Sequence, residues 1–386
     1  MRRSFQYKAS LSRRVAEAAR GQLAVCCELY NACLQERRDH RRLRGVSVTA
    51  AQQMAQLPEI KQVRPDLAAV GSQVVQDVVQ RLDRAYRAFF RRVRAGEAPG
   101  FPRFKSRHRY DSLTFKQAGW ALGPVSASGQ KRTLTLHGIG TFRLFWSREL
   151  EGRVKTVTLR RDRCGDWWAT FSCDDVPERL LPATGAAAGI DVGLEAFLTT
   201  SDGDRVENPR PLGAATAGLR KAQRVVSKRR KGGTRRRKAV RRLAVRHRRV
   251  ERVRRDFHHK AALALVRRYD LLAVEALNVK GLQRGRLARS VSDVAWGQFL
   301  SILGAKAADA ARTVIAVDPR GTSQQCSACG AAPERPKALA ERAHRCPCGY
   351  AAHRDVNAAR NILARGLAMM GRAGPSASRP AVRAAA

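Results

Sequence analysis

The sequence predicts a multidomain chain in which a helical part and a run of short strands precede an α/β half. Apolar residues recur at steps of three and four from Leu67 to Val93, and short alternating runs begin at Ser112. After residue 187, strand-like and helix-like segments alternate, which is typical of α/β folds. At about 150 residues per domain, a chain of 386 residues has room for more than one domain.

Residues 11–94 read as helical, and the helix that ends near residue 94 carries two stripes. One stripe is apolar and is expected to face a core. The other is polar and consists of Gln73, Gln76, Gln80, Arg84, Arg87 and Arg91. Glutamine can bond to adenine, and arginine reaches phosphate or guanine, so this stripe is a candidate face for reading a nucleic-acid groove. A solvated helix surface is the alternative.

The helical pattern ends near residue 95, where glycines and prolines follow one another. Short strands are expected at 112–116, 133–146, 154–161 and 167–173, a spacing that favours a small barrel or sandwich. Aromatic and basic residues interleave between Phe101 and Tyr110. Such a mixture can stack bases and bind a phosphate backbone, although barrel packing explains the aromatic residues by itself.

The α/β half begins after a linker rich in Pro, Ala and Gly. Strands are expected at 187–191, 194–200, 270–275 and 313–318, with a helix near 295–311. Between Arg220 and Arg255 about half of the residues are Lys or Arg, but one apolar seam persists, which predicts a helical hairpin. The residues from Gly371 onward are rich in Ala, Ser, Pro and Arg and are expected to be disordered.

The charge balance points to a polyanion. The chain has 75 Lys and Arg against 32 Asp and Glu, a formal net charge of +43, and nucleic acid is the commonest partner of such a surplus. No run of 18 apolar residues and no secretory h-region is present, so we expect a cytoplasmic protein with no membrane partner, and the charge surplus favours association with the nucleoid. Five scattered cysteines are then most simply small buried hydrophobes: Cys26, Cys27, Cys33, Cys164 and Cys173.

The other four cysteines form paired knuckles, Cys326 with Cys329 and Cys346 with Cys348. Four thiolates at this spacing meet the tetrahedral demand of one structural Zn²⁺, and the glycine after each pair allows a tight turn. The second knuckle is C-x-C rather than C-x-x-C, so His344 or His353 could replace one thiolate. A redox pair or plain buried thiols are the alternatives.

Three carboxylates stand out against the basic background: Asp191, Glu275 and Asp355. Asp191 and Glu275 end apolar strands, and Asp355 begins a helix just after the cysteine cluster. Taken singly, they could be a turn former, a surface residue and an N-cap. Burying bare carboxylates is costly, however, and three of them can hold a pair of Mg²⁺ ions, which is the arrangement that cuts phosphodiesters.

These acidic residues sit in segments that resemble the three RuvC motifs of TnpB proteins, which are encoded by insertion sequences and are similar to type V CRISPR nucleases. The segments are 189–194 (Gly-Ile-Asp-Val-Gly-Leu), 274–282 (Val-Glu-Ala-Leu-Asn-Val-Lys-Gly-Leu) and 354–362 (Arg-Asp-Val-Asn-Ala-Ala-Arg-Asn-Ile). The segments 287–290 and 322–330, together with Trp296, also resemble the family. The C-x-C knuckle and His353, where an acidic residue is more frequent, depart from its pattern.

The resemblance implies a domain plan. A β-barrel wedge domain would span 1–10 and 95–180, with a helical recognition domain inserted at 11–94. An RNase H-like RuvC nuclease domain would span 185–322 and 350–370, with the basic hairpin at about 212–260, a zinc ribbon at 323–349 and a disordered tail at 371–386.

The resemblance also implies an activity. The protein would act as a monomer with a guide RNA from the transposon end and would cut double-stranded DNA beside a short transposon-associated motif, base pairing supplying the sequence choice. Asp191 would bridge two Mg²⁺ ions, with Glu275 holding one and Asp355 the other. The rival hypotheses are a nuclease-inactive RNA-guided repressor, a transposase or transposition accessory protein, and a basic zinc-ribbon protein such as a ribosomal component.

Overall fold

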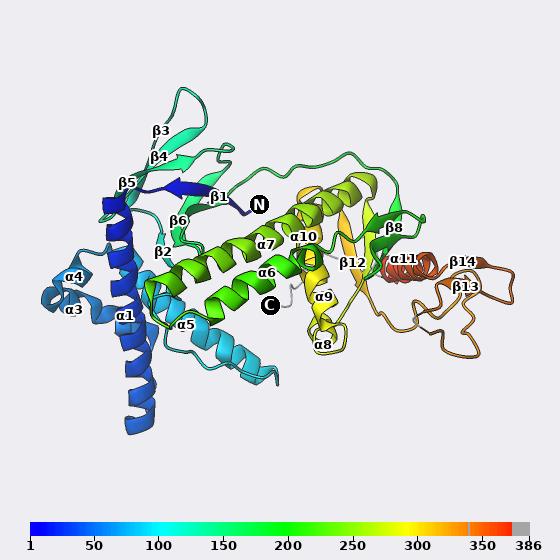
Figure 1. Ribbon diagram of the computed structural model, residues 1–386, viewed down its shortest axis with the longest axis horizontal. Helices are drawn as coiled ribbons and strands as arrows, with labels where there is room; N and C mark the ends of the chain where they lie inside the picture. Colours follow the sequence, from blue (N-terminus) through cyan, green and yellow to red (C-terminus); the bar gives the residue numbers. More distant parts are fainter. Residues whose placement is uncertain (339, 373–386) are drawn as a thin grey trace. The chain divides into compact units, whose positions relative to one another are not determined.

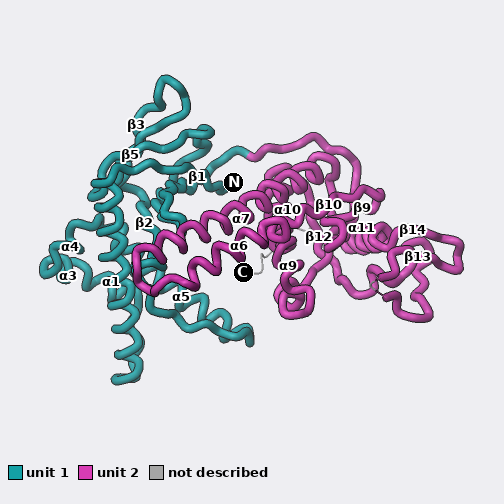
Figure 2. The backbone as a smooth tube through the Cα atoms, viewed as in Figure 1, with its two compact units in different colours: residues 1–177 teal, residues 178–386 magenta. Residues whose placement is uncertain are grey.

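A computed structural model gives the structure of the protein and describes residues 1–338 and 340–372. The chain divides into two compact units, residues 1–177 and the residues from 178 onward (Figure 1 and Figure 2). None of the helices in the described ranges combines the length and apolar character that a bilayer crossing requires.

The helices of the first unit come before all but one of its strands. They are α1 (Arg13–Arg44), α2 (Ala50–Ala55), α3 (Leu57–Val63), α4 (Pro65–Ala68) and α5 (Ser72–Arg94). The Ser12 side chain accepts a hydrogen bond from the Val15 amide at the start of α1, and Gly45 ends that helix in the left-handed conformation. Helices therefore occupy most of residues 11–94, as the apolar periodicity predicts.

Seven antiparallel strands form one sheet in the order β2-β6-β7-β1-β5-β4-β3. Their bounds are β1 (Arg3–Ser10), β2 (Ser112–Phe115), β3 (Trp120–Val125), β4 (Lys131–Leu136), β5 (Gly140–Phe145), β6 (Arg153–Arg161) and β7 (Trp167–Asp174). The pairings of the described residues leave β2 and β3 as edges, so the hydrogen bonds describe an open sheet rather than a closed barrel.

Two details of this sheet differ from the sequence expectation. The run at 133–146 is divided into β4 and β5 by a turn in which Gly138 has a φ of +70°. The strand β3 was not expected, because Gly123 and Pro124 lie within it, and its pairing with β4 shifts register between Leu122 and Val125.

One continuous core joins the helices of the first unit to its sheet. Leu34 and Leu82 from the helices are fully buried with Leu144 and Phe171 from the strands. The sequence periodicity therefore places the apolar stripe of α5 correctly as far as Leu82.

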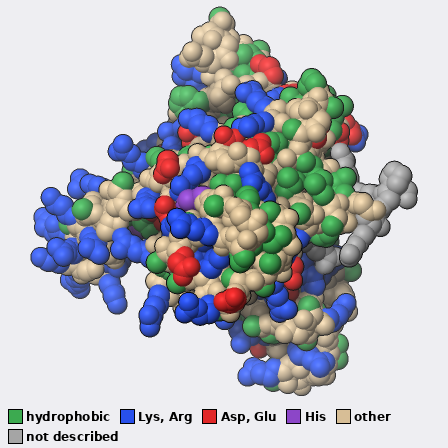
Figure 3. Space-filling model, turned by 90° about the vertical axis from the view of Figure 1, so that its right-hand side faces the viewer, with side chains coloured by type: hydrophobic (Ala, Val, Ile, Leu, Met, Phe, Trp, Pro, Cys, Tyr) green, Lys and Arg blue, Asp and Glu red, His purple; other side chains and the backbone are tan. Residues whose placement is uncertain are grey.

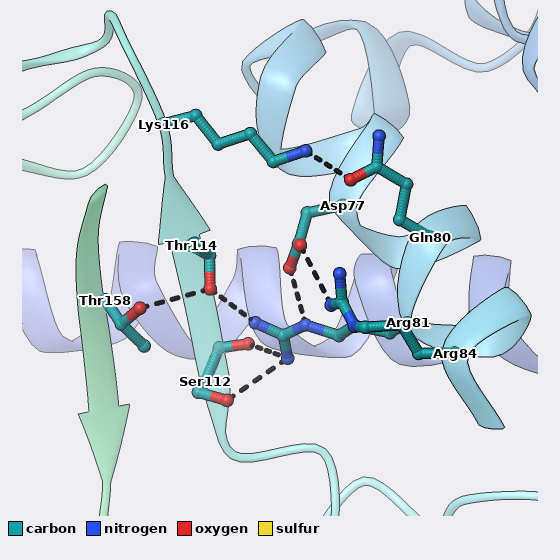
Figure 4. Close-up of polar contacts among 8 residues, drawn as sticks. All are labelled: Asp77, Gln80, Arg81, Arg84, Ser112, Thr114, Lys116 and Thr158. Atoms are coloured by element: carbon teal, nitrogen blue, oxygen red, sulfur yellow. Dashed lines mark hydrogen bonds and ion pairs between the residues drawn. The ribbon is translucent and has the colours of Figure 1, made fainter. Parts of the chain in front are cut away.

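A buried polar network also ties α5 to β2 (Figure 4). The Asp77 side chain is 4% exposed and accepts from Arg81 Nε at 2.6 Å and from Arg84 Nη2 at 3.2 Å. Arg81 also donates to the Ser112 carbonyl at 2.8 Å and to Thr114 Oγ1 at 2.8 Å. Every charge in this network has a partner of opposite charge or a hydrogen-bond acceptor, which is the condition for burying it.

The second unit is built on a five-stranded sheet in the order β10-β9-β8-β11-β12. The strands are β8 (Ala187–Val192), β9 (Ala196–Thr200), β10 (Arg205–Glu207), β11 (Leu271–Glu275) and β12 (Thr313–Val317). β11 lies parallel to both β8 and β12, whereas β8–β9 and β9–β10 are antiparallel pairs. A separate two-stranded ribbon consists of β13 (Ala343–Arg345) and β14 (Ala351–His353).

Helices cover both faces of this sheet, which confirms the α/β prediction. The helices are α6 (Pro211–Ser227), α7 (Thr234–Arg268), α8 (Val279–Leu282), α9 (Ala288–Val294), α10 (Trp296–Asp309) and α11 (Arg354–Arg372). Ile190, Leu272 and Val274 pack with α7 and α10 on one face, while Leu271 and Ala273 pack with Ile362 of α11 on the other. The helices α6 and α7 form the expected basic hairpin.

Lys and Arg side chains are spread over much of the face shown in Figure 3, with Asp and Glu as smaller patches among them. The described part of the chain ends with α11 at Arg372. Residues 371 and 372 are therefore helical rather than part of the expected tail, and the rest of the predicted tail, 373–386, lies outside the described residues.

Candidate active site and metal centre

Asp191 and Glu275 lie side by side at the carboxyl ends of two parallel strands. Ile190 of β8 is paired with Val274 of β11, so the next residues along the two strands are also neighbours. Side chains alternate between the faces of a strand, and Gly189 and Ala273 face α11. Asp191 and Glu275, two residues further along, therefore face α11 as well.

Asp355 reaches this point because α11 lies unusually close to the sheet. A methyl group at Gly189 would overlap the Ala359 carbonyl oxygen, and one at Gly366 would lie 2.6 Å from Ala273 Cβ. Asp355 is one helical turn before Ala359, about 6 Å along the axis, and Asp191 is about 6–7 Å along β8 from Gly189. The two glycines thus seat the first turn of α11, with Asp355, beside the strand ends.

Glu275 and Asp355 both lie close enough to Asp191 for their charges to affect its pKa. Burial first, and then the charges of Glu275 and Asp355, together raise the pKa of Asp191 to about 8, while Arg354 and Arg342 act in the opposite direction. Within the described part of the chain, no donor forms a hydrogen bond or ion pair with the Asp191 carboxylate. Asp191 is therefore a partly buried acid whose charge the protein itself leaves without a direct partner.

Glu275 has one direct partner. Thr322 Oγ1 donates to Glu275 Oε1 at 2.6 Å, and Thr322 is itself only 2% exposed. Burial raises the pKa of Glu275, although this hydrogen bond and the charge of Arg365 oppose the shift. Asp355 lies at the positive end of the α11 dipole, with Arg342 Nη1 at 4.0 Å and His353 Nδ1 at 3.8 Å from its carboxylate.

Other sheltered acids of the second unit are treated differently. Asp270 accepts from the Thr184 and Gly185 amides at 2.9 and 2.8 Å and pairs with Arg312 at 2.8 Å; although desolvation opposes it, these bonds lower its pKa. Asp293 accepts from the Leu212 amide at 2.9 Å at the start of α6. Asp270 and Asp293 therefore accept hydrogen bonds from nearby donors, whereas Asp191 has no such donor among the described residues.

The carboxylates are less tightly gathered than the thiols. Among residues 1–338 and 340–372, the four cysteines are the only group of three or more His, Cys, Asp or Glu whose ligand atoms all lie within 4.8 Å of one another. Like charges repel, so three carboxylates without a cation are not expected to approach one another as closely as neutral thiols do. The oxygen-only donor set at two strand ends and a helix start suits Mg²⁺.

A polar stripe on α11 fixes the loop that carries Thr322. Asn361 Nδ2 donates to the Thr322 and Gln325 carbonyls, both at 2.8 Å, and Asn357 Nδ2 donates to the Gln325 carbonyl at 2.8 Å. Arg365 Nη1 donates to the Asp318 carbonyl at 2.7 Å. The sequence pattern alone does not predict these roles, although Asn357, Asn361 and Thr322 lie within the segments 354–362 and 322–330.

The four predicted zinc-ligand cysteines come together as one cluster. The Sγ atoms of Cys326 and Cys348 are 3.8 Å apart, and those of Cys329 and Cys346 are 3.6 Å apart. A tetrahedron with Zn–S bonds of about 2.3 Å has edges of about 3.8 Å, so this spacing fits the ion. Although desolvation opposes it, hydrogen bonds from the Cys329 backbone and the His344 side chain lower the pKa of Cys326 to about 6, which favours the thiolate ligand.

Neither candidate histidine is needed to complete the cluster. The His344 side chain is 2% exposed and lies against Tyr350, with its Nδ1 next to Lys337 Nζ. His353 is directed to the start of α11, where its Nδ1 accepts from the Asp355 amide at 3.2 Å. The five scattered cysteines are all buried, as predicted.

The polar stripe of α5 is only partly available to a ligand. Gln80 accepts from Lys116 Nζ (Figure 4), and Gln73 accepts from the Ala118 amide at 3.2 Å, so two of its glutamine carbonyls are engaged within the unit. The remaining members are exposed: Gln76, Arg84, Arg87 and Arg91. The groove-reading role of the stripe stays a prediction for these four.

Comparison with known families matches two segments of the chain. Residues 171–286 match the OrfB_IS605 family, described as "Probable transposase". Residues 296–362 match the "Cas12f1-like, TNB domain" family. The first segment contains Asp191 and Glu275, and the second contains Asp355 and the cysteine cluster.

Two relatives cover most of the chain, and both are named "Putative RNA-guided DNA endonuclease". The protein from Streptomyces pristinaespiralis is 37% identical over 309 residues, 78% of this chain and 73% of the relative. InsQ of Escherichia coli K12 is 30% identical over 316 residues, 78% and 75% of the two chains.

Two solved structures share the fold. The chain in the cryo-EM structure of a Cas12f1–sgRNA–target DNA complex matches with a TM-score of 0.60 at 14% identity, over 92% of this chain and 83% of that one. The mini-RNA-guided endonuclease CRISPR-Cas_phi3 matches with a TM-score of 0.52 at 9% identity, over 98% and 94%.

Proposed function

The chain belongs to the TnpB family, and from this membership we propose that it is an RNA-guided DNA endonuclease whose cutting site consists of Asp191, Glu275 and Asp355. The observation that carries this proposal is the unpartnered Asp191 carboxylate beside two further acids. A carboxylate with a structural role is expected to have hydrogen-bond donors, as the Asp270 carboxylate has.

The acidic trio would hold two Mg²⁺ ions, with Asp191 shared between them, Glu275 on one and Asp355 on the other. Such a pair of ions supplies activation of the attacking water and charge stabilisation at the leaving oxygen. The protein's own contribution is placement. Thr322 would orient Glu275 through its hydrogen bond to Oε1, and α11 would place Asp355 beside the strand ends. Burial without a direct partner would favour binding of a cation by Asp191.

The cysteine cluster would bind one structural Zn²⁺. Its ion has four thiolates and no open position, so it would stabilise the ribbon rather than take part in cutting. Because Ser327 N donates to Asn357 Oδ1 at 2.8 Å, the ribbon is joined to α11 only two residues from Asp355. Zinc would therefore also help to fix the position of the acidic trio.

The partners would be a guide RNA from the transposon end and double-stranded DNA beside a short transposon-associated motif, with one protein chain per RNA. The charge of +43 supports two polyanionic partners. In this arrangement base pairing selects the target, while the protein reads the short motif and the heteroduplex shape.

The test is plasmid cleavage by the purified protein–RNA complex in Mg²⁺. We expect Asp191→Ala to abolish cleavage and to leave RNA and DNA binding intact. Asp256→Asn is the matched control, because Asp256 is an exposed residue of α7 that pairs with Lys260 on the same helix. Cleavage by Asp191→Ala at the wild-type rate would refute the assignment, and binding without cleavage by the wild type would favour the repressor alternative.

A further inference from the structure

The first unit contains a cavity of about 880 Å³ between the C-terminal halves of α1 and α5. Aromatic side chains form its apolar wall, and charged side chains surround them. The aromatic residues are Tyr86, Phe89, Phe90 and Phe101. Nothing in the cutting site or the cysteine cluster uses this cavity.

The aromatic wall near the C-terminal end of α5 is exposed, although the apolar residues in the first half of the same helix are buried. Val78 and Leu82 of α5 are fully buried, whereas Phe90 is 50% exposed and Val93 is 49% exposed. Phe101, from the segment after α5, is 45% exposed. The apolar stripe therefore continues beyond the core of the unit, and exposed apolar area of this kind marks an interaction surface.

The rings form an ordered cluster rather than scattered surface residues. Phe101 meets Phe89 edge-on at 5.2 Å and Tyr86 edge-on at 5.6 Å between ring centroids. Phe90 stacks against Tyr86 at 6.4 Å. The exposed rings of Phe90 and Phe101 are thus held by neighbouring aromatic rings and present π-surfaces that a planar group can stack on.

The charge around the rings favours an anion. The lining includes five arginines (Arg37, Arg38, Arg41, Arg42 and Arg87) against two acids (Asp39 and Asp83). The Arg37 guanidinium lies 5.2 Å from the centroid of the Tyr86 ring, so a cationic and an aromatic group of the lining are in direct contact. Arg87, a member of the α5 stripe, is 81% exposed at its side chain, and its Nε pairs with Asp83 Oδ2 at 2.7 Å. The rest of this exposed guanidinium faces solvent, where a phosphate can reach it.

We propose that this cavity binds an unpaired nucleotide, with the base stacked on Phe90 or Phe101 and the phosphates against the arginine rim. A planar apolar base flanked by phosphates matches both the rings and the charge, whereas an apolar peptide would leave the arginines unused. The inference rests on the proposed function for the class of ligand, because the RNA or the opened DNA would supply the nucleotide.

The experiment measures binding of labelled eight-nucleotide oligomers to the full-length protein at about 0.2 M salt, where phosphate-only binding is weak. Uridine and thymidine oligomers are compared with abasic oligomers of the same length and charge. We expect the double variant Phe90→Ala/Phe101→Ala to bind the base-containing oligomers about 10-fold more weakly and the abasic ones unchanged.

The matched control is Phe145→Ala on β5, since Phe145 is also 50% exposed and has Lys8 Nζ 6.0 Å from its ring, but it does not line the cavity. Phe90→Trp should keep the base-dependent affinity that Phe90→Ala loses, because tryptophan also offers a ring for stacking. If the double variant lowers the thermal midpoint, Phe90→Leu carries the test, because it keeps apolar volume and removes the ring.

An effect confined to the uridine oligomer would assign the nucleotide to RNA, and one confined to the thymidine oligomer would assign it to DNA. Equal base-dependent affinity in the double variant and the wild type would overturn the inference and leave the nuclease proposal untouched. A wild type that binds none of the oligomers would also overturn the inference, whereas the proposed function is tested separately by plasmid cleavage.

Discussion

Asp77 in the first unit and Asp191 in the second are both sheltered carboxylates, yet their surroundings differ. Asp77 lies between Arg81 and Arg84, which donate to both of its oxygens. Asp191 has no donor among the described residues and has two further carboxylates nearby. A sheltered acid with its own cation stabilises a fold, whereas one among other acids destabilises it until a cation arrives.

The largest expected effect on stability is at Asp77, and its absence would contradict the comparison. We expect Asp77→Ala to lower the free energy of unfolding by about 3–5 kcal/mol, because it leaves the largely buried Arg81 guanidinium, 17% exposed, without its counter-charge. Chemical denaturation of the full-length protein measures this. Asp66→Ala is the control, since Asp66 pairs with Arg64 on the surface and should change stability little. A loss at Asp77 no greater than at Asp66 would contradict the structural role.

Asp191 should show the opposite sign and a dependence on pH. Its folded pKa of about 8 lies above its ordinary value of 3.8, so its contribution to stability is fully present below about pH 4 and is lost as pH rises through 8. In magnesium-free buffer, Asp191→Asn should therefore become more stable than the wild type by up to about 1.4 kcal/mol per pH unit between pH 6 and 8.

Thermal melts at several pH values, with zinc retained, measure this difference. A constant difference between Asp191→Asn and the wild type across that range would show that Asp191 does not titrate there. Added Mg²⁺ should raise the melting temperature of the wild type and leave that of Asp191→Asn nearly unchanged.

The smallest effect sharpens the comparison at Glu275, the acid of the second unit that has one donor. Thr322→Val removes the hydroxyl that holds Glu275 Oε1, and we expect cleavage at limiting Mg²⁺ to fall about 10-fold, a loss of about one hydrogen bond to a charged group. The Mg²⁺ concentration for half-maximal cleavage should rise, and Thr322→Ser should restore it. A reduced rate with an unchanged Mg²⁺ requirement would rule out this positioning role.

The sequence predicted the parts of the second unit whose causes are local. The spacing of Cys326, Cys329, Cys346 and Cys348 predicts their meeting because each pair lies on one tight turn. Strand ends at Asp191 and Glu275 follow from short apolar runs, and parallel pairing of β8 with β11 brings them together. The roles of the trio as metal ligands stay predictions.

Features that depend on distant contacts were not predictable. The hydrogen bonds of Asn357 and Asn361 reach a loop more than 30 residues earlier in the chain, and only the fold brings them together. The engagement of Gln80 by Lys116 depends on where β2 lies against α5, so helical periodicity alone made Gln80 appear free. The edge strand β3 was likewise not predictable, because Gly123 and Pro124 within it are unfavourable in strands.

The contact at Gly189 has a consequence for any attempt to redesign this protein. Because Gly189 has no side chain, α11 packs directly against β8, and a single added carbon there would push the helix away from the sheet. Since Asp355 rides on that helix, the third acid would retreat from its partners while every acidic residue remained in the sequence. A sequence search for the three acids would then classify the site as intact although the acids no longer met.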